Sequence, residues 1–146
     1  MIYLMLGTDK GDRMANLSRA RELLSQKLSV TLQCSGIMET EAIGFDGLAF
    51  LNQAVAFEAD IKPHDLLAVC QGIEAAMGRK PHKARYGKDG RRIYKPRVID
   101  IDILMMNDLA VDTEDLTIPH PQVESRPYVK VLLQQLTNEE ERSNNQ

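Results

Sequence analysis

Val98-Ile99-Asp100-Ile101-Asp102-Ile103-Leu104-Met105-Met106 is the most strand-like stretch of the chain, and it carries two acids. The odd positions from 99 to 105 are all apolar, while Asp100 and Asp102 occupy alternate positions. Because side chains alternate between the two faces of a strand, both carboxylates lie on one face. A sheet with one solvated face would show the same alternation, but aspartate is among the residues least favoured in strands.

A strongly basic segment runs directly into this strand. Residues 78–97 hold nine of the eighteen Lys and Arg residues and one acid, Asp89, although the whole chain has a formal net charge of -3. A solvated surface loop is the commoner explanation of such a run. An anion-binding loop is the more specific alternative, and Gly87 and Gly90 would allow it to open and close.

The acidic pair and the basic segment together suggest a metal–nucleotide site. Two carboxylates on one face repel each other unless a cation lies beside them. Oxygen ligands without nearby Cys or His favour a hard ion, and Mg²⁺ takes one or two carboxylates plus water and substrate phosphates. The metal needs the carboxylates and a polyphosphate needs the cations, so the neighbouring clusters suit a Mg²⁺–nucleotide.

Upstream, the spacing of apolar residues predicts five further elements. They are a strand over residues 2–6, a helix over residues 15–28, strands over residues 30–37 and 50–58, and a helix over residues 63–77. Asp12 can cap the first helix, while Pro63 suits the first turn of the second helix and Gly78 its end.

Downstream, the chain has fewer apolar residues. Asn107-Asp108 predicts a hairpin turn with a return strand over residues 109–111. An extended loop with three prolines follows, and then a helix over residues 128–136. Residues 138–146 are polar and poor in apolar residues, so we expect a disordered C-terminal tail.

This order of elements predicts an α+β fold. It resembles the ferredoxin-like α/β sandwich, with an antiparallel-rich sheet and helices packed on it. Neither an internal repeat nor a linker interrupts the pattern, so we expect residues 1–137 to form a single domain. A chain of 146 residues can bury roughly two-thirds of the surface that it exposes when unfolded.

The cysteines and the apolar stretches bear on the compartment. Cys34 and Cys70 are the only cysteines, and we expect both to be reduced core residues. The apolar run at residues 2–6 is too short for a signal peptide, and every apolar stretch falls short of the roughly 20 residues that a membrane-spanning helix needs. We therefore expect a cytoplasmic protein with no role at a membrane. We also expect the protein to be a monomer.

The segment Pro96-Arg97-Val98-Ile99-Asp100-Ile101-Asp102 resembles the signature Pro-Arg-x-x-Asp-hydrophobic-Asp of the 6-hydroxymethyl-7,8-dihydropterin pyrophosphokinases. Further similarities to that family follow in the same order along nearly the whole chain. They are Glu39-Thr40, Phe50-Leu51-Asn52-Gln53-Ala54-Val55, Gln71-Gly72-Ile73-Glu74, Met77-Gly78-Arg79 and Leu116-Thr117-Ile118-Pro119-His120.

The resemblance implies a reaction and a metal. A pyrophosphoryl group would pass from ATP to the hydroxymethyl oxygen of the pterin, releasing AMP, in folate biosynthesis. Two Mg²⁺ ions would be held by Asp100 and Asp102. The same resemblance assigns catalytic or phosphate-facing roles to Arg79, Arg97, His120 and Arg126. No side chain need act as a base, because phosphoryl transfer depends mainly on positioning and on cations.

The resemblance also implies two binding sites. The pterin would be bound by Thr40, Ile43, Phe50, Asn52 and Tyr128, with Asn52 at the pterin edge and the two aromatic rings sandwiching the heterocycle. The nucleotide would be bound by Gln71, Glu74, Arg79, Lys83, Arg85, Arg97, Ile103, Thr117 and His120. Two alternatives stay open: Phe50 and Tyr128 could be core aromatics, and Arg91 or Arg92 could replace Lys83 or Arg85.

Several residues depart from the family pattern, which bears on the function. Gly7-Thr8-Asp9 replaces the usual Gly-Ser-Asn, and Asp115 stands where a nucleotide-contacting arginine can occur. A diverged relative that binds nucleotide without activity is therefore one alternative. A nucleic-acid-binding module that uses residues 79–97 is another, although the overall acidity argues against it and we expect no nucleic-acid partner. A metal-dependent nuclease would lack the matches to a pterin pocket.

Overall fold

The structure is a computed structural model that describes residues 1–41, 49–78 and 97–144, with side chains described as far as residue 137. Its elements are β1 (Ile2–Thr8), α1 (Arg13–Leu28), β2 (Gln33–Thr40), β3 (Phe50–Phe57), α2 (Pro63–Ala76), β4 (Asp100–Met106), β5 (Val111–Asp112), β6 (Thr117–Ile118), α3 (Gln122–Ser125) and α4 (Pro127–Asn144). None of the described helices is long and apolar enough to cross a bilayer.

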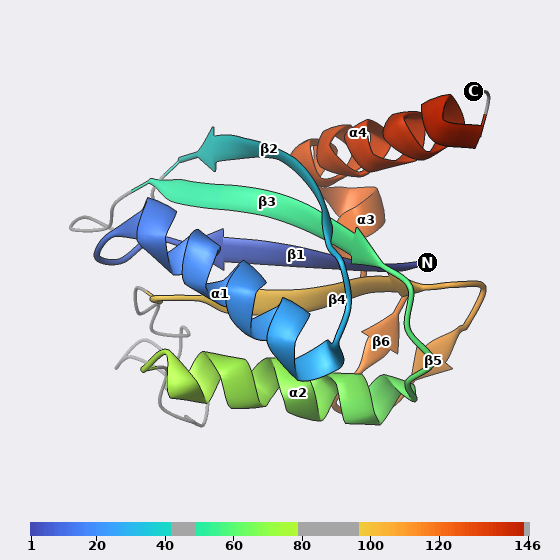
Figure 1. The fold of residues 1–146 in the computed structure, drawn as a ribbon, viewed down its shortest axis with the longest axis horizontal. Coiled ribbons are helices and arrows are strands. Elements are labelled where there is room, and N and C mark those ends of the chain that lie inside the picture. The colour runs from blue at the N-terminus through green and yellow to red at the C-terminus, as the bar shows by residue number, and fades with distance from the viewer. Residues whose placement is uncertain (42–48, 79–96, 145–146) are drawn as a thin grey trace, which may run out of the picture.

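Four strands form an antiparallel sheet in the order β2-β3-β1-β4 (Figure 1). With α1 between β1 and β2 and α2 between β3 and β4, the chain follows the βαββαβ pattern of ferredoxin-like folds. The prediction of an α+β sandwich with an antiparallel-rich sheet is confirmed. In this order β2 and β4 lie at the two edges of the sheet, and β1 and β3 lie at its centre.

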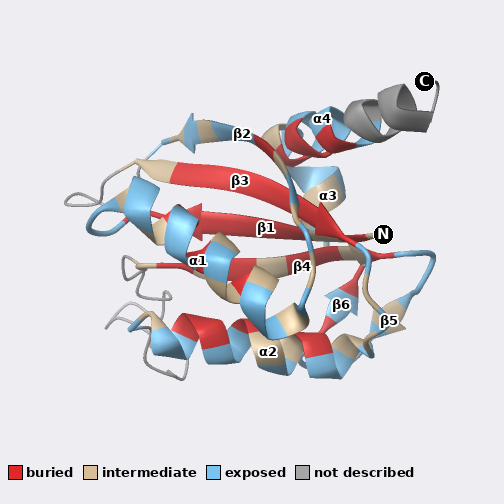
Figure 2. Cartoon of the chain, in the orientation of Figure 1, coloured by how far each residue is buried: buried red, intermediate tan, exposed pale blue. Residues whose placement is uncertain are grey.

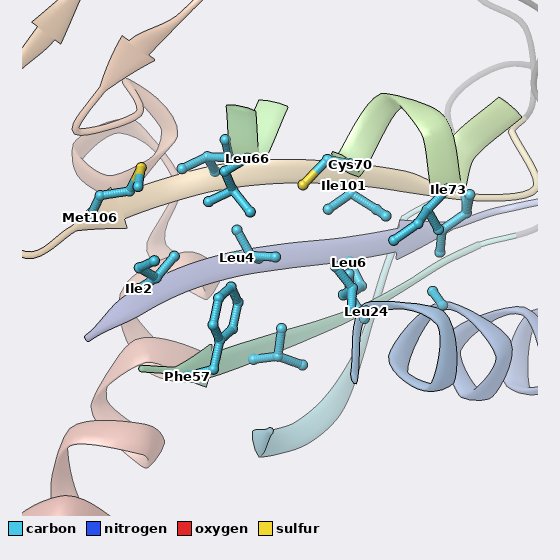
Figure 3. Close-up of a cluster of buried hydrophobic side chains, with 14 of the residues drawn as sticks. Ile2, Leu4, Leu6, Leu24, Phe57, Leu66, Cys70, Ile73, Ile101 and Met106 are labelled. Carbon is cyan, nitrogen blue, oxygen red and sulfur yellow. The ribbon is translucent and has the colours of Figure 1, made fainter. Parts of the chain in front are cut away.

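The sheet has a separate apolar cluster on each face. On one face, side chains of β1 and β4 pack against α1 and α2, as Figure 3 shows for Leu4, Leu24, Cys70 and Ile101. On the other face, residues of the sheet such as Met5 pack against α4. Figure 2 shows β1 and β3 buried along most of their length, while the helices expose their outer surfaces. The sheet is therefore covered on both faces.

The helix ends follow local chemistry that the sequence predicts. Asp12 caps α1, since the backbone N–H of Ala15 donates to its carboxylate at 3.1 Å. Pro63 stands in the first turn of α2, where its missing N–H costs no helical hydrogen bond. Gly78 follows α2 with φ of +102°, a conformation that side-chain-bearing residues rarely adopt. The start of α1 and both ends of α2 are therefore explained by residues that the sequence identifies.

The region after β4 differs from the prediction. Asn107 does form a turn, with φ of +53°, but the chain does not return along β4. Instead β5 pairs with β6 in a separate two-stranded sheet. The register of β1 with β4 also shifts by one residue near Leu104, so the alternation of β4 changes phase there.

The C-terminal helix is longer than the helix predicted over residues 128–136. α4 extends to Asn144 and so covers most of the segment for which we expected a disordered tail. The sequence of that segment includes Glu and Arg, which favour helices when a packed helix precedes them. A low content of apolar residues therefore does not by itself exclude a helix.

Candidate active site

Asp100 and Asp102 lie on β4, at the edge of the sheet. Both are half-buried, and the residues between and after them, Ile101 and Ile103, are buried in the cluster under α1 and α2. The carboxylates therefore belong to the opposite face, on which α4 packs. This confirms the alternation read from the sequence as far as Ile103, and places both acids at a strand whose outer edge is not covered by another strand of the sheet.

A polar row crosses the sheet beside these acids. Gly7 of β1 pairs with Asp100 of β4 on one side and with Asn52 of β3 on the other. Directly paired residues in an antiparallel sheet point to the same face, so Asn52 and Asp100 flank a position that has no side chain. A Cβ on Gly7 would lie 3.6 Å from Oδ1 of Asn52 and 3.8 Å from the Phe50 ring. The glycine leaves room between an amide and a carboxylate.

The Asn52 side chain has a fixed orientation. It is 4% exposed, and its Nδ2 donates to the Met38 carbonyl at 3.2 Å and to Oγ1 of Thr40 at 3.0 Å. These two bonds direct the amide nitrogen toward β2 and leave Oδ1 on the side of Gly7. Three of the predicted pterin residues, Thr40, Phe50 and Asn52, are thus brought together at one end of β2 and β3.

Arg97 lies immediately before β4 and faces Asp100. Its Nη1 is 3.5 Å from Oδ1 of Asp100, while its Nε is buried without a hydrogen-bond partner among the described residues. A buried donor with no acceptor costs about 1 to 3 kcal/mol. An anion bound beside Arg97 would remove this cost, so the orphaned Nε fits a phosphate site.

A pocket of about 330 Å³ lies at the outer edge of β4, between α2 and the β5–β6 hairpin. It is lined by Leu67, Ile101, Asp102, Ile103, Glu114, Asp115, Leu116, Thr117, His120 and Pro121. Three residues predicted to bind nucleotide, Ile103, Thr117 and His120, line it together with the predicted metal ligand Asp102. Residues from separate parts of the sequence therefore meet at one cavity.

The surroundings of His120 favour the neutral ring in one tautomer. The backbone N–H of Gln122 donates to Nδ1 of His120 at 3.1 Å, so Nδ1 carries no proton and Nε2–H is the donor of the ring. Burial lowers the pKa of His120, and the positive charge of Arg126 adds to this effect, while the negative charge of Asp100 opposes it. His120 can therefore donate a hydrogen bond to a phosphate without carrying a charge.

Glu74, predicted to approach the nucleotide, contacts the edge of the sheet. It is 8% exposed, and its Oε2 accepts from the backbone N–H of Ile101 at 2.9 Å. Its charge, with that of Asp102, adds to the effect of burial, which raises the pKa of the neighbouring Cys70 thiol to about 12. Cys70 is a core residue, as predicted, and is not a nucleophile.

The other predicted residues fall into two groups. Arg126 and Tyr128 lie around the start of α4, where Nη1 of Arg126 donates to the Tyr128 hydroxyl at 3.2 Å, and Gln71 is exposed on α2. Ile43, Arg79, Lys83 and Arg85 lie outside the described residues, as do the alternatives Arg91 and Arg92.

The structure adds pocket residues that the sequence did not indicate as binding residues. Leu67, Glu114 and Leu116 line the pocket, and Asp115 does so while bonded to His64, with Oδ1 to Nε2 at 3.0 Å. This bond, with a second from Thr113, lowers the pKa of Asp115. Nothing in the sequence marks these contacts, because they join elements that only the fold brings together.

The donors present fit Mg²⁺. The described residues contain no group of three or more His, Cys, Asp or Glu that could enclose a metal. Mg²⁺ is nevertheless commonly bound by only one or two protein carboxylates, such as these two half-buried ones beside the pocket. Water and phosphate oxygens then complete its coordination shell. Such a site is typical of phosphoryl-transfer enzymes, and this is the class of protein that the fold and the site define.

The comparisons with known proteins agree with this class. A family model described as 7,8-dihydro-6-hydroxymethylpterin-pyrophosphokinase (HPPK) matches residues 3–138. The 2-amino-4-hydroxy-6-hydroxymethyldihydropteridine pyrophosphokinase of Porphyromonas gingivalis is 38% identical over 135 residues, covering 91% of this chain and 88% of the relative. The Bacillus subtilis enzyme of the same name is 36% identical over 142 residues, covering 96% of this chain and 80% of the relative.

A plant relative is similar over part of its length. The folate synthesis bifunctional protein of Arabidopsis thaliana is 35% identical over 145 residues, covering 98% of this chain and 28% of the relative. The chain belongs to the 7,8-dihydro-6-hydroxymethylpterin-pyrophosphokinase family. The resemblance read from the Pro96–Asp102 signature is thereby confirmed.

Proposed function

We propose that this protein transfers the pyrophosphoryl group of ATP to the hydroxymethyl oxygen of 6-hydroxymethyl-7,8-dihydropterin, releasing AMP, as a step in folate biosynthesis. The hydroxyl oxygen forms a bond to the β-phosphorus of ATP, and the bond from that phosphorus to the oxygen shared with the α-phosphate breaks. The hydroxyl proton passes to water, and AMP leaves with the electron pair of the broken bond. Family membership supports the reaction, and the polar row Asn52–Gly7–Asp100 carries the argument for where it takes place.

The pterin lies across this row. Oδ1 of Asn52 accepts from an N–H of the pterin edge, because the amide nitrogen of Asn52 is already engaged by β2. Phe50 lies against Gly7 and offers an aromatic face to the flat heterocycle. Strands are about 4.8 Å apart, so Asn52 and Asp100 are separated by roughly the length of a pterin that ends in a hydroxymethyl group. Thr40, Ile43 and Tyr128 complete the proposed pterin site.

The nucleotide occupies the pocket at the edge of β4. Ile103 and Thr117 contact the nucleoside, Nε2–H of His120 donates to a phosphate oxygen, and Gln71 and Glu74 approach from α2. The Nε donor of Arg97 and the exposed Arg126 bind phosphate oxygens. Arg79 and either Lys83 or Arg85 supply further positive charge from the basic segment. Cations placed around the transferred group contribute most of the catalysis in such reactions.

Asp100 and Asp102 hold the metal, for which we propose two Mg²⁺ ions. Lewis-acid chemistry is what Mg²⁺ supplies when bound there, since it offsets phosphate charge and lowers the pKa of a nearby hydroxyl. Asp100 also interacts with Arg97, so this carboxylate orients the arginine as well as binding metal. Cytoplasmic localisation, a monomeric state and the absence of a nucleic-acid partner remain predictions.

The test of the reaction is the identity of its nucleotide product. The purified protein is mixed with ATP, Mg²⁺ and the hydroxymethyl pterin, and nucleotides are separated by ion-exchange chromatography. We expect AMP in an amount equal to the pterin diphosphate, and none when either the pterin or Mg²⁺ is omitted. Formation of ADP, or of AMP without pterin, would contradict the proposal and would indicate an ordinary kinase or a nucleotide hydrolase.

A further inference from the structure

We infer that Asp9 is a positioning residue of the active site, which holds the backbone of Arg97 in place and through it the start of β4. The inference rests on the proposed roles of Arg97 and Asp100. Asp9 lies in the loop between β1 and α1, and nothing in its exposure suggests a contact with substrate, because the residue is 1% exposed. It acts on the reaction through another residue.

The contact between Asp9 and Arg97 has two hydrogen bonds in opposite directions. The backbone N–H of Arg97 donates to Oδ1 of Asp9 at 2.7 Å, and the backbone N–H of Asp9 donates to the Arg97 carbonyl at 3.1 Å. The two residues are 88 positions apart in the sequence. Asp9 therefore satisfies both the N–H and the C=O of Arg97, as a neighbouring strand would do. Arg97 itself precedes β4, which begins at Asp100.

The loop that carries Asp9 is itself anchored. Nδ2 of Asn16, in the first turns of α1, donates to Oγ1 of Thr8 at 3.2 Å and to the Lys10 carbonyl at 2.8 Å. Thr8 is fully buried. The residues on both sides of Asp9 are thus held by the helix, so the carboxylate has a rigid support.

The position of Arg97 determines two features of the site. Its guanidinium lies 3.5 Å from Asp100, and its buried Nε has no hydrogen-bond partner among the described residues. Without Asp9, the backbone of Arg97 would lose both of these hydrogen bonds. A displacement of about 1 Å at a catalytic group can lower turnover by about 100-fold.

The test compares substitutions in this loop and in the first turn of α1. Asp9→Ala removes the acceptor, Asp9→Asn keeps an oxygen in the same place, and Asn16→Ala loosens the loop without changing Asp9. Asp12→Ala is the matched control, because it removes a carboxylate from the same loop that caps α1 and does not contact Arg97. Each folded variant is examined for hydrogen exchange of the Arg97 amide, for turnover, and for calorimetric affinity for a non-hydrolysable ATP analogue with Mg²⁺.

We expect faster exchange at the Arg97 amide in Asp9→Ala, a fall in kcat on the order of 100-fold, and weaker binding of the analogue. The KM for the pterin should stay near its wild-type value, because Asn52 and Phe50 are not displaced. Asp9→Asn should restore all three quantities, and Asn16→Ala should show smaller changes in the same direction. Asp12→Ala should lower the melting temperature and leave kcat and analogue affinity unchanged.

Two results would overturn the inference. One is faster exchange at Arg97 in Asp9→Ala with unchanged kcat and analogue affinity, and the other is a loss in Asp9→Asn as large as that in Asp9→Ala. If Asp9→Ala does not fold, Asn16→Ala and Asp9→Asn still decide the matter. If the wild-type protein makes no AMP, the proposed function is wrong. The role of Asp9 is then still tested, because hydrogen exchange and analogue binding do not depend on turnover.

Discussion

His120 shows how one hydrogen bond can favour the neutral form of a residue that we propose binds phosphate. The backbone N–H of Gln122 occupies Nδ1, so protonation of the ring would break this bond as well as place a charge in a half-buried position beside Arg126. The nearby carboxylate of Asp100 offsets only part of that cost. The ring therefore offers a neutral donor at physiological pH.

The lowered pKa of His120 predicts a pH dependence of stability. A histidine in the unfolded chain titrates near pH 6.5, and the pKa of His120 in the folded protein lies below that value. As the pH falls through about 6.5, the unfolded chain binds the proton first, so the free energy of unfolding decreases. Below the folded-state pKa, no further change comes from this group.

His120→Asn, which removes the titrating ring, should flatten this decrease. Urea unfolding of the wild type and the variant between pH 7.5 and pH 5 measures it. His64→Asn is the matched control, because His64 is half-exposed and interacts with the carboxylate of Asp115 instead of lying in the site. Equal pH slopes in the wild type and in His120→Asn would show that the ring does not titrate abnormally.

At the scale of single residues, the sequence identifies candidate functional side chains when they belong to a local sequence pattern. Asp100 and Asp102 are recognisable because strand alternation places them on one face, and His120 because it stands in a stretch similar to the family. Asp9 is different, since its inferred role depends on hydrogen bonds to the backbone of a residue 88 positions along the chain. No spacing or composition encodes such a contact, so it could only be found in the structure.

At the scale of elements, β4 is an edge strand that α2 holds in place. The Oε2 atom of Glu74 accepts from the N–H of Ile101, a group that would otherwise meet the pocket without a partner. Edge strands with open backbone groups are prone to pair with other chains. Glu74 thus connects the helix before the basic segment with the strand that carries the proposed metal ligands.

We predict that Glu74→Ala destabilises the protein by about 1 to 3 kcal/mol, because it leaves a buried N–H unsatisfied and creates a small cavity. Glu74→Gln, which keeps an acceptor oxygen, should cost less. Equilibrium unfolding in urea gives both values, and Glu22→Ala on the exposed face of α1 should change stability by no more than about 0.5 kcal/mol. A cost for Glu74→Ala no larger than that of Glu22→Ala would mean that the bond to Ile101 does not hold the strand.

The elements also show the limit of local patterns. The strands and helices up to β4 were predictable, since alternation, helical spacing and caps are local. The hairpin after β4 was predicted wrongly, because Asn107-Asp108 does specify a turn but not the partner of the next strand. That partner is β6, and the choice depends on how the proline-rich stretch packs beside the pocket.

At the scale of the whole molecule, the two faces of the sheet differ in composition and in proposed role. The face under α1 and α2 is an apolar core that fixes β1 and β4 relative to each other. The opposite face is apolar only where α4 covers it, and its other end carries Asn52, Gly7 and Asp100. One rigid sheet thereby sets the distance between the proposed pterin site and the proposed metal site.

The central claim is that the two carboxylates of β4 bind the metal that accompanies the nucleotide. The most direct measurement is calorimetric titration of a non-hydrolysable ATP analogue into the protein with and without Mg²⁺. We predict Mg²⁺-dependent binding that Asp100→Asn and Asp102→Asn each weaken by about 100-fold or more, while Asp108→Asn in the turn after the same strand leaves it unchanged. Equal Mg²⁺-dependent affinity in all four proteins would contradict the account.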